Sequence, residues 1–180
     1  MKVIFFDRDN TLNYDPGYLS DPDGVYLLPY VVEGLKILQK LNFQFIIITN
    51  QSGIGRGYFT EETLFKINQK LLSLLSKEGI DFLNIFYCPH TEKDNCSCRK
   101  PKPGLIHQAL SLYPEIDLQQ SWIIGDRISD IKTGESLSIK GILIDSSLQP
   151  DGTSPKNLIH VARNLKDAAE FIENHILKRN

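Results

Sequence analysis

The chain has 180 residues, of which 41% are hydrophobic and 23% are charged, and its formal net charge is −2. These values are typical of one globular α/β domain that is long enough to bury its own core. So small a net charge gives no reason to expect nucleic acid or an anionic membrane as a partner. No apolar run approaches the roughly 18 residues that a membrane-spanning helix needs. These values therefore predict a single domain over residues 1–180. We also expect a monomer.

Two features bear on the cell compartment. Only Met1 and Lys2 precede the first predicted strand, and they show no signal-peptide pattern, so we expect a cytoplasmic protein. The three cysteines all lie between positions 88 and 98, and an odd, clustered set argues against a disulfide framework.

The first predicted strand is the apolar run at residues 3–6, which leads directly into Asp7 and Asp9. Side chains alternate along a strand, so two acids spaced i, i+2 point to the same side. Their repulsion must be offset by basic side chains or by a divalent cation. Taken alone, the stretch is equally consistent with a surface turn, because Asp, Asn and Thr favour turns.

The next segments form a long loop, a helix and a second strand. Residues 14–24 are rich in Pro, Gly and Asp and predict an irregular loop over the two acids. Pro29 predicts the first position of a helix that runs to about Lys40. The apolar residues 43–48 predict a buried strand, followed by a glycine-rich turn over 49–57. Its backbone N–H groups and Arg56 suit an anion, although a flexible turn without a ligand is the alternative.

A helix over 60–77 and a strand over 81–87 precede the cysteine segment. Two thiols, an imidazole and a third thiol at short spacings form a four-ligand tetrahedral set for Zn²⁺, made by Cys88, His90, Cys96 and Cys98. Four protein ligands leave no open coordination position, so we expect a structural zinc loop at 88–98. The alternative is a set of scattered, reduced thiols.

Basic residues and prolines occupy positions 99–104, directly after the cysteine segment. They fit either a solvated surface run or a stiff segment that directs Lys100 or Lys102 inward. The remaining pattern predicts a helix over 105–112, a strand over 121–124 that ends near Asp126, a short helix over 131–137, a strand over 141–144 and a closing helix over 164–177.

Strands that alternate with helices predict a doubly wound, mostly parallel, Rossmann-like sheet. Ligands of such sheets bind beyond the carboxyl ends of the strands. The two acids, Thr49, a lysine and Asp126 all fall at that edge. This set suits phosphoryl transfer, with Asp7 as nucleophile, Asp9 as general acid and base, and Mg²⁺ held by Asp7 and Asp126. Thr49 and the lysine would stabilise the phosphoryl oxygens.

The motifs D-x-D-x-T and G-D-x-x-x-D, with the threonine and the lysine, resemble the haloacid dehalogenase superfamily of phosphatases. The stretches FFDRDNTLN, DPGY, ITNQSGIGRG, YCPH, CSCRKPKPG and IIGDR together resemble its zinc-containing branch over about residues 3–145. That branch includes the heptose 1,7-bisphosphate 7-phosphatases and the histidinol-phosphate phosphatases. The resemblance implies no separate cap domain, Mg²⁺ bound by Asp7, Asp126 and the backbone carbonyl of Asp9, and Lys100 as the motif lysine. It also implies that the substrate meets Asp15, Gly17, Tyr18, Asn50, Gln51, Ser52, Arg56, Arg99 and Arg127.

Departures from the pattern concern the substrate more than the reaction. Asn10 replaces the usual glycine of D-x-D-G-T, and asparagine tolerates unusual φ values at small cost. Arg127 and the five-residue spacer between His90 and Cys96 resemble the histidinol-phosphate enzymes, whereas NYDPGY and SGIGRG resemble the heptose enzymes. The expected activity is hydrolysis of heptose 1,7-bisphosphate, with histidinol phosphate as the alternative substrate and a non-catalytic phosphate- or metal-binding module as an alternative class.

Overall fold

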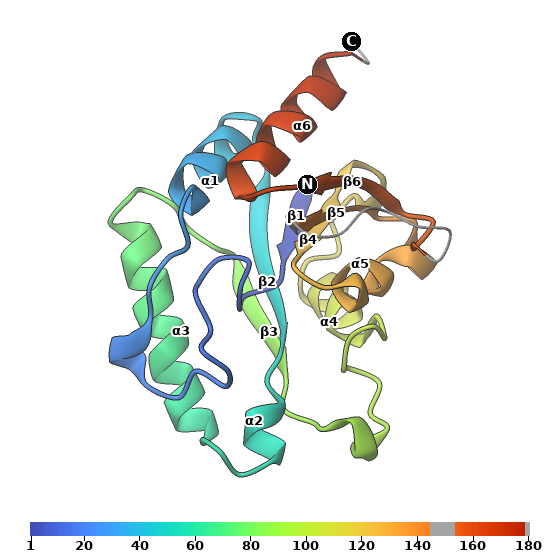
Figure 1. Cartoon of the computed structure of the whole chain (residues 1–180). Coiled ribbons are helices and arrows are strands. Elements are labelled where there is room, and N and C mark those ends of the chain that lie inside the picture. Colours follow the sequence, from blue (N-terminus) through green and yellow to red (C-terminus); the bar gives the residue numbers. More distant parts are fainter. Residues whose placement is uncertain (145–153, 179–180) are drawn as a thin grey trace.

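The computed structural model describes residues 1–144 and 154–178, and in this part of the chain six parallel strands form one sheet of order β3-β2-β1-β4-β5-β6 (Figure 1). The predicted doubly wound α/β fold is confirmed. The strands are β1 (Val3–Phe6), β2 (Gln44–Asn50), β3 (Asn84–Cys88), β4 (Trp122–Gly125), β5 (Lys140–Ile144) and β6 (Leu158–Ala162).

Helices cover both faces of the sheet. Helices α1, α3 and α6 pack on one face, and α4 and α5 lie on the other (Figure 1). The α-helices are α1 (Val31–Lys40), α2 (Ser52–Gly55), α3 (Glu61–Ser76), α4 (Gly104–Leu112), α5 (Ile128–Thr133) and α6 (Leu165–Leu177). Short 3-10 turns are η1 (Pro22–Gly24), η2 (Glu92–Asp94), η3 (Leu118–Gln120) and η4 (Glu135–Leu137). No helix in the described residues is long and apolar enough to cross a membrane.

The side chains of β1 alternate between the two faces of the sheet, and they are buried on both. Ile4 and Phe6 belong to the core beneath α1, α3 and α6, whereas Val3 and Phe5 belong to the core beneath α4. All four side chains are fully buried, and burying each one contributes about 1.5–3 kcal/mol. The alternating side chains of one short strand therefore tie the two layers together and fix the point at which Asp7 leaves the sheet.

Several predicted boundaries were wrong. Helix α1 begins at Val31 and not at Pro29, because Tyr30 takes a left-handed conformation with φ 66° as its N-cap. The predicted helix over 131–137 is α5 followed by η4, and α5 begins at Ile128 because the Asp130 carboxylate accepts the N–H of Arg127 at 2.9 Å. Strand β2 continues to Asn50, so Thr49 lies within the strand. Strand β6 was not predicted.

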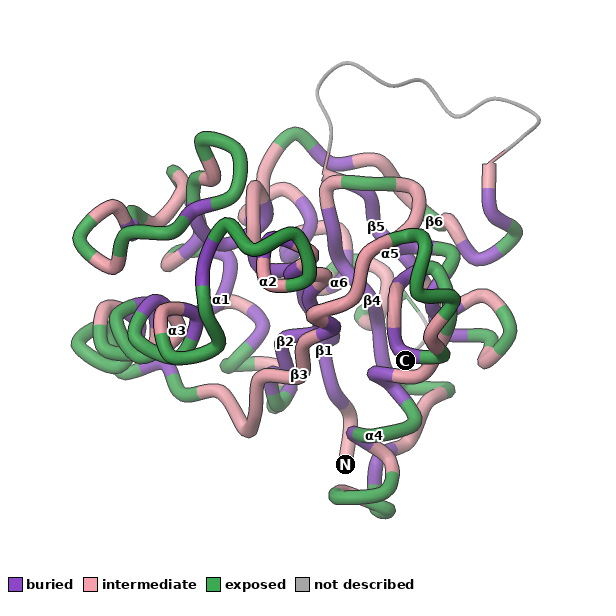
Figure 2. The backbone as a smooth tube through the Cα atoms, turned by 90° about the horizontal axis from the view of Figure 1, so that it is seen from below, coloured by how far each residue is buried: buried purple, intermediate pink, exposed green. Residues whose placement is uncertain are grey.

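The carboxyl ends of the strands share one edge of the sheet. Figure 2 views the molecule from below Figure 1, and the buried tube of β1, β2 and β4 occupies its centre with more exposed loops around it. The backbone N–H of Asp7 still donates to the Ile124 carbonyl at 2.9 Å, so the segment after β1 stays beside the end of β4. This pairing brings residues from distant parts of the chain to the same edge.

Candidate functional site

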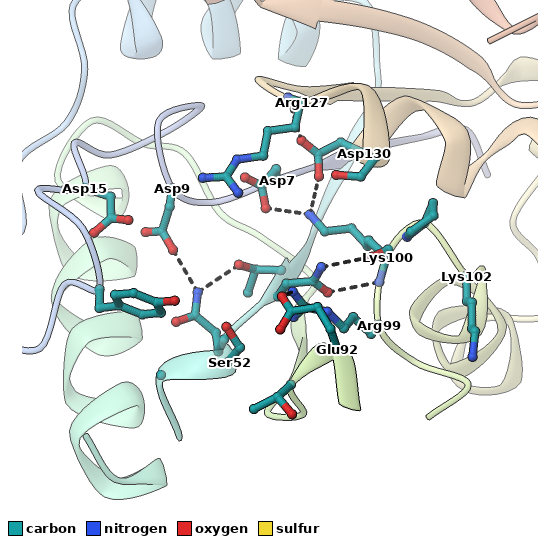
Figure 3. Close-up of a pocket in the computed structure, with 18 of the residues that line it drawn as sticks. Asp7, Asp9, Asp15, Ser52, Glu92, Arg99, Lys100, Lys102, Arg127 and Asp130 are labelled. Atoms are coloured by element: carbon teal, nitrogen blue, oxygen red, sulfur yellow. Dashed lines mark hydrogen bonds and ion pairs between the residues drawn. The ribbon is translucent and has the colours of Figure 1, made fainter. Parts of the chain in front are cut away.

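A pocket of about 620 Å³ lies at this edge of the sheet (Figure 3). Its walls include all four residues predicted to be catalytic, which are Asp7, Asp9, Thr49 and Lys100. They come from the ends of β1 and β2 and from the segment that follows the cysteine loop. The polar residues therefore meet in one concavity of the size that small ligands use.

Lys100 is the centre of the charged network. Its Nζ lies 2.6 Å from Asp7 Oδ1, 2.7 Å from Asp130 Oδ1 and 2.8 Å from the Ile48 carbonyl oxygen (Figure 3). Only 2% of its side chain is exposed. Lys102 Nζ instead donates to Asn95 Oδ1 and the Cys96 carbonyl. Of the two lysines that the sequence left open, Lys100 is the one that reaches the acids.

Three carboxylates, those of Asp7, Asp126 and Asp130, have oxygens within 4.8 Å of one another. One oxygen, Asp126 Oδ1, is buried and has no hydrogen-bond partner. An unpartnered buried carboxylate oxygen is costly unless something else binds it, and oxygen donors of this kind suit Mg²⁺. The donor set therefore fits the predicted Mg²⁺ site.

Asp130 was missing from the predicted ligand set, and the carboxylate of Asp9 is not part of the cluster. The signal for Asp130 was present in the G-D-x-x-x-D spacing, which puts a second acid in the first turn of α5. Gly125 makes the approach possible, because a Cβ at this position would lie 2.4 Å from Asp130 Cβ.

Burial shifts the protonation equilibria of the cluster. It raises the pKa of Asp7 to about 8, against the opposing effect of Lys100 and with help from the neighbouring acids. Burial and the nearby Asp130 raise the pKa of Asp126 to about 6. Desolvation works against the Lys100 ammonium, but Asp130 and Asp7 outweigh it and raise the Lys100 pKa. Without a metal ion, the cluster therefore holds protons that an unfolded chain would release.

Magnesium binding is expected to strengthen as the pH rises toward 8. Between the ordinary pKa of 3.8 and the raised value of about 8, folded Asp7 binds more protons than unfolded Asp7, so the metal-free protein loses stability as pH rises through this range. Mg²⁺ needs the carboxylate, so its apparent affinity should weaken about tenfold for each pH unit below 8 while one proton is displaced. Thermal unfolding with and without added Mg²⁺ at pH 6 and pH 8 measures this.

The increase in melting temperature caused by Mg²⁺ should be larger at pH 8, and Asp7→Asn should remove most of the difference. Equal increases at both pH values would contradict the expectation.

Asp9 is held by several donors. Its Oδ1 accepts from Arg8 Nε at 2.9 Å and Asn13 Nδ2 at 3.1 Å, and its Oδ2 accepts from Arg8 Nη2 at 2.9 Å and Gln51 Nε2 at 2.8 Å. Arg8 is 1% exposed, and its Nη1 donates to Asn68 Oδ1 on α3. The sequence did not single out Arg8 or Asn13. The position of Asp9 is thus fixed by a buried guanidinium that is itself anchored to α3.

The residues after Thr49 support other site residues. Gln51 Nε2 donates to Thr49 Oγ1 at 2.9 Å as well as to Asp9, so one amide links the two. The Asn50 side chain bonds both backbone groups of Lys100, donating to its carbonyl at 3.2 Å and accepting its N–H at 3.0 Å. The pocket is lined by all four consecutive residues Thr49, Asn50, Gln51 and Ser52.

The loop after β1 is organised by Asp15. Its Oδ1 accepts the N–H groups of Gly17 at 3.1 Å and Leu19 at 2.8 Å, and its own N–H donates to Asn10 Oδ1 at 3.1 Å. Asn10 has φ 57°, as its tolerance of unusual φ suggested, and Gly17 and Tyr18 have φ 104° and 59°. The Tyr18 ring lies edge-on to Tyr58, with centroids 4.9 Å apart. Asp15, Gly17 and Tyr18 all line the pocket.

The three predicted substrate arginines have different surroundings. Arg99 and Arg127 line the pocket, whereas Arg56 is not among the lining residues. Arg56 Nη2 pairs with Glu92 Oε2 at 2.7 Å, and Arg99 pairs with the other oxygen of the same carboxylate. The Arg127 side chain is 74% exposed, with its Nε 3.9 Å from Asp126 Oδ2.

The cysteine loop brings its four predicted ligands together. Cys88 Sγ lies 3.0 Å from Cys98 Sγ and 3.6 Å from Cys96 Sγ, and His90 Nδ1 lies 3.2 Å from Cys98 Sγ. Zn–S bonds of about 2.3 Å place tetrahedral sulfurs roughly 3.7 Å apart, so this set could close around one metal ion. Burial raises the pKa of Cys88, whereas for Cys96, burial is outweighed by donors that include the Arg99 N–H, and its pKa falls to about 7.

Comparison with known proteins gives concordant matches. Residues 2–144 match the family described as polynucleotide kinase 3 phosphatase. The chain is 38% identical over 145 residues to D-glycero-beta-D-manno-heptose-1,7-bisphosphate 7-phosphatase from Haemophilus influenzae, a match that covers 77% of this chain and 78% of that protein. It is 39% identical over 144 residues to the histidine biosynthesis bifunctional protein HisB from Blochmanniella floridana, covering 78% of this chain and 40% of that protein.

A solved structure supports the same relationship. The D,D-heptose 1,7-bisphosphate phosphatase from B. bronchiseptica, complexed with magnesium and phosphate, has a TM-score of 0.83 to this chain at 29% sequence identity. The similarity covers 97% of this chain and 99% of that chain.

Proposed function

The chain belongs to the polynucleotide kinase 3 phosphatase family and, with its heptose bisphosphatase relatives, to the haloacid dehalogenase superfamily, and from this membership we propose that it is a Mg²⁺-dependent phosphatase that hydrolyses D-glycero-D-manno-heptose 1,7-bisphosphate at the 7-phosphate. One observation in this chain supports the proposal independently of the similarity to its relatives. A buried lysine bridges Asp7 and Asp130, which line the pocket and belong with Asp126 to a cluster of three carboxylates. This arrangement provides a metal site, a nucleophile and a cation for a phosphoryl group at one point.

The first chemical step forms a bond between Asp7 Oδ and phosphorus and breaks the bond from phosphorus to the sugar oxygen. Asp9, two residues further on, gives a proton to the leaving alkoxide. Thr49 and Lys100 stabilise the phosphoryl oxygens as charge shifts between them. Asp7, Asp126 and Asp130 would hold Mg²⁺, and the bound ion would screen the phosphate charge so that a carboxylate could approach it.

The second step returns the enzyme to its starting state. Asp9 takes a proton from water, the resulting hydroxide bonds to phosphorus, and the Asp7–phosphorus bond breaks to release inorganic phosphate. Four hydrogen bonds donated to Asp9 suit this step, in which it begins as a carboxylate. In the first step Asp9 must carry a proton, so it must also give up at least one of these donors.

A screen of phosphate release tests the substrate. Heptose 1,7-bisphosphate, histidinol phosphate and simple sugar monophosphates are compared at equal concentration, with and without Mg²⁺. We expect the highest kcat/KM for the heptose bisphosphate and no turnover without a divalent cation. A preference of about tenfold or more for histidinol phosphate, equivalent to roughly 1.4 kcal/mol, would replace the proposed substrate.

Histidinol-phosphate phosphatase is the second candidate, and specific observations favour it. The match to the bifunctional HisB protein is as strong in identity as the match to the heptose enzyme, although the chain covers only 40% of that protein. Arg127 and the short spacer between His90 and Cys96 also resemble that branch. Both candidates use the same cluster, so only the substrate screen separates them.

For the cysteine loop we propose a structural Zn²⁺ site within a single phosphatase domain over 1–180. Residues 91–95 contribute no buried side chain, so metal coordination would be the main constraint on them. The cysteines form no disulfide, and zinc binding needs their thiolates, which supports a reducing compartment such as the cytoplasm. We also propose that the enzyme acts as a monomer, since the four residues predicted to be catalytic all line one pocket of a single chain.

Substitution Cys96→Ser is expected to remove bound zinc and loosen the loop. Zinc content should fall from about one ion per chain to near zero, because a serine hydroxyl is a poor Zn²⁺ ligand at neutral pH. Backbone hydrogen exchange over 88–102 should accelerate, and kcat/KM should fall about tenfold, since Arg99 and Lys100 follow directly after Cys98. Elemental analysis and exchange mass spectrometry measure the first two changes, and steady-state phosphate release measures the third.

The matched control is Ser97→Ala, which changes an exposed residue between two ligands and should keep one zinc per chain. Unchanged zinc content in Cys96→Ser would refute the ligand assignment.

A further inference from the structure

One carboxylate at the rim of the pocket bridges two arginines. Glu92 Oε2 lies 2.7 Å from Arg56 Nη2, and Glu92 Oε1 pairs with Arg99 Nη2. Each oxygen of this carboxylate therefore engages a different guanidinium. Glu92 and Arg99 line the pocket, and Figure 3 shows them side by side below Lys100. Arg56 does not line the pocket but pairs with Glu92, which does.

The backbone segments that carry the two arginines are held together by contacts that do not involve Glu92. Arg99 Nη1 also donates to the His90 carbonyl oxygen at 3.1 Å. Arg56 follows Gly55, whose N–H donates to the Pro89 carbonyl oxygen at 3.0 Å. A Cβ at Gly55 would lie 2.8 Å from that oxygen, so α2 is packed against the cysteine loop with no space between them. Backbone contacts thus keep the segments that carry Arg56 and Arg99 together.

Glu92 is the most exposed member of the group. It starts the three-residue turn η2, and its side chain is 60% exposed, against 34% for Arg56 and 21% for Arg99. Exposed ion pairs contribute little, because water solvates the separated charges almost as well. A phosphate group has more negative charge and more acceptor oxygens than a carboxylate, and guanidinium groups bind it through paired hydrogen bonds. A phosphate that reaches this rim should therefore displace Glu92.

We propose that Glu92 occupies the Arg56–Arg99 pair in place of the non-transferred phosphate of a bisphosphate substrate and gives way when that substrate binds. The proposal rests on the proposed function. Because the carboxylate must leave before the second phosphate can bind, Glu92 lowers the affinity for bisphosphates. It does not affect monophosphates in the same way, since they have no group to place there. Glu92 is thus a specificity-determining residue.

The test compares Glu92→Gln with Asp94→Asn. Glutamine keeps the size of Glu92 but removes the competing charge. Asp94 lies in the same turn and also carries a carboxylate, but it accepts from Thr91 N at 2.6 Å and Thr91 Oγ1 at 2.7 Å rather than from an arginine. For Glu92→Gln, KM for heptose 1,7-bisphosphate should fall about three- to tenfold with little change in kcat. KM for p-nitrophenyl phosphate should not change, and Asp94→Asn should leave both KM values unchanged.

An unchanged or higher bisphosphate KM in Glu92→Gln would overturn the proposal, as would an equal effect on both substrates. Calorimetric binding of the bisphosphate to the Asp7→Asn protein, with and without Glu92→Gln, gives the same comparison without turnover. If the unaltered enzyme hydrolyses p-nitrophenyl phosphate but not the bisphosphate, the proposed function fails, whereas the binding measurement still decides the role of Glu92. Higher salt should shrink the difference in bisphosphate affinity that Glu92→Gln causes, because it screens the arginines.

Discussion

Substitution Asp7→Asn is expected to abolish hydrolysis while the protein stays folded. An amide oxygen is too weak a nucleophile to form the covalent bond to phosphorus, so kcat should fall at least ~10⁴-fold. The other carboxylates, Asp126 and Asp130, remain, so Mg²⁺ should still bind, although more weakly. Single-turnover phosphate release measures the chemical step directly.

The fold should tolerate this change because Asp7 is already an unfavourable place for a charge. Burial raises its pKa to about 8 against the opposing effect of Lys100, so a charge at this position costs more in the folded protein than in the unfolded chain. Asparagine has nearly the same shape, and its Oδ1 can still accept from Lys100 Nζ. The melting temperature without Mg²⁺ should stay within a few degrees of the unaltered protein.

Asp81→Asn is the matched control, since it makes the same chemical change at an exposed position before β3 and should keep full activity. Hydrolysis by Asp7→Asn above about one part in a hundred would remove Asp7 from the role of nucleophile, because loss of a nucleophile leaves far less than this.

The sheet could be predicted because its central strands are nearly continuous apolar runs. Strands β1 and β2 are buried on both faces, and such runs stand out from the polar loops around them. Strand β6 could not be predicted in the same way. It lies at the edge of the sheet, His160 is one of its residues and Ile159 is 43% exposed, so its apolar pattern is broken. Its place depends on pairing with β5, which is a tertiary contact.

Many of the site residues could be predicted from the sequence, because the carboxyl ends of parallel strands lie at the same edge of a sheet. Asp7, Thr49 and Asp126 follow from that rule alone. Contacts made by loops did not follow from it. Nothing in the sequence pattern distinguishes Arg8, yet it is buried and binds Asp9 and Asn68, because α3 supplies an acceptor 60 residues away. The bridge of Glu92 to two arginines likewise depends on how α2 packs against the cysteine loop.

Lys100→Met should have the second largest effect, and it should reduce both stability and activity. The substitution leaves Asp7 and Asp130 buried without their cation, and breaking a buried ion pair on one side typically costs about 3–5 kcal/mol. For a chain of this size, that corresponds to a melting temperature roughly 6–20 °C lower. Added Mg²⁺ should recover part of the loss, because it supplies positive charge to the same carboxylates.

The activity of Lys100→Met should fall about 10²–10³-fold, the usual effect of removing one group that stabilises developing charge. The pH dependence separates this role from simple unfolding. Lys100 lowers the pKa of Asp7, so its removal should raise that pKa further and move the ascending part of the kcat/KM profile to higher pH. Lys102→Met is the matched control, since its Nζ contacts Asn95 and the Cys96 carbonyl rather than an acid. It should keep both its pH profile and most of its activity. A Lys100→Met enzyme with an unshifted profile would show that the lysine does not set the charge state of the nucleophile, because the two groups would then titrate independently.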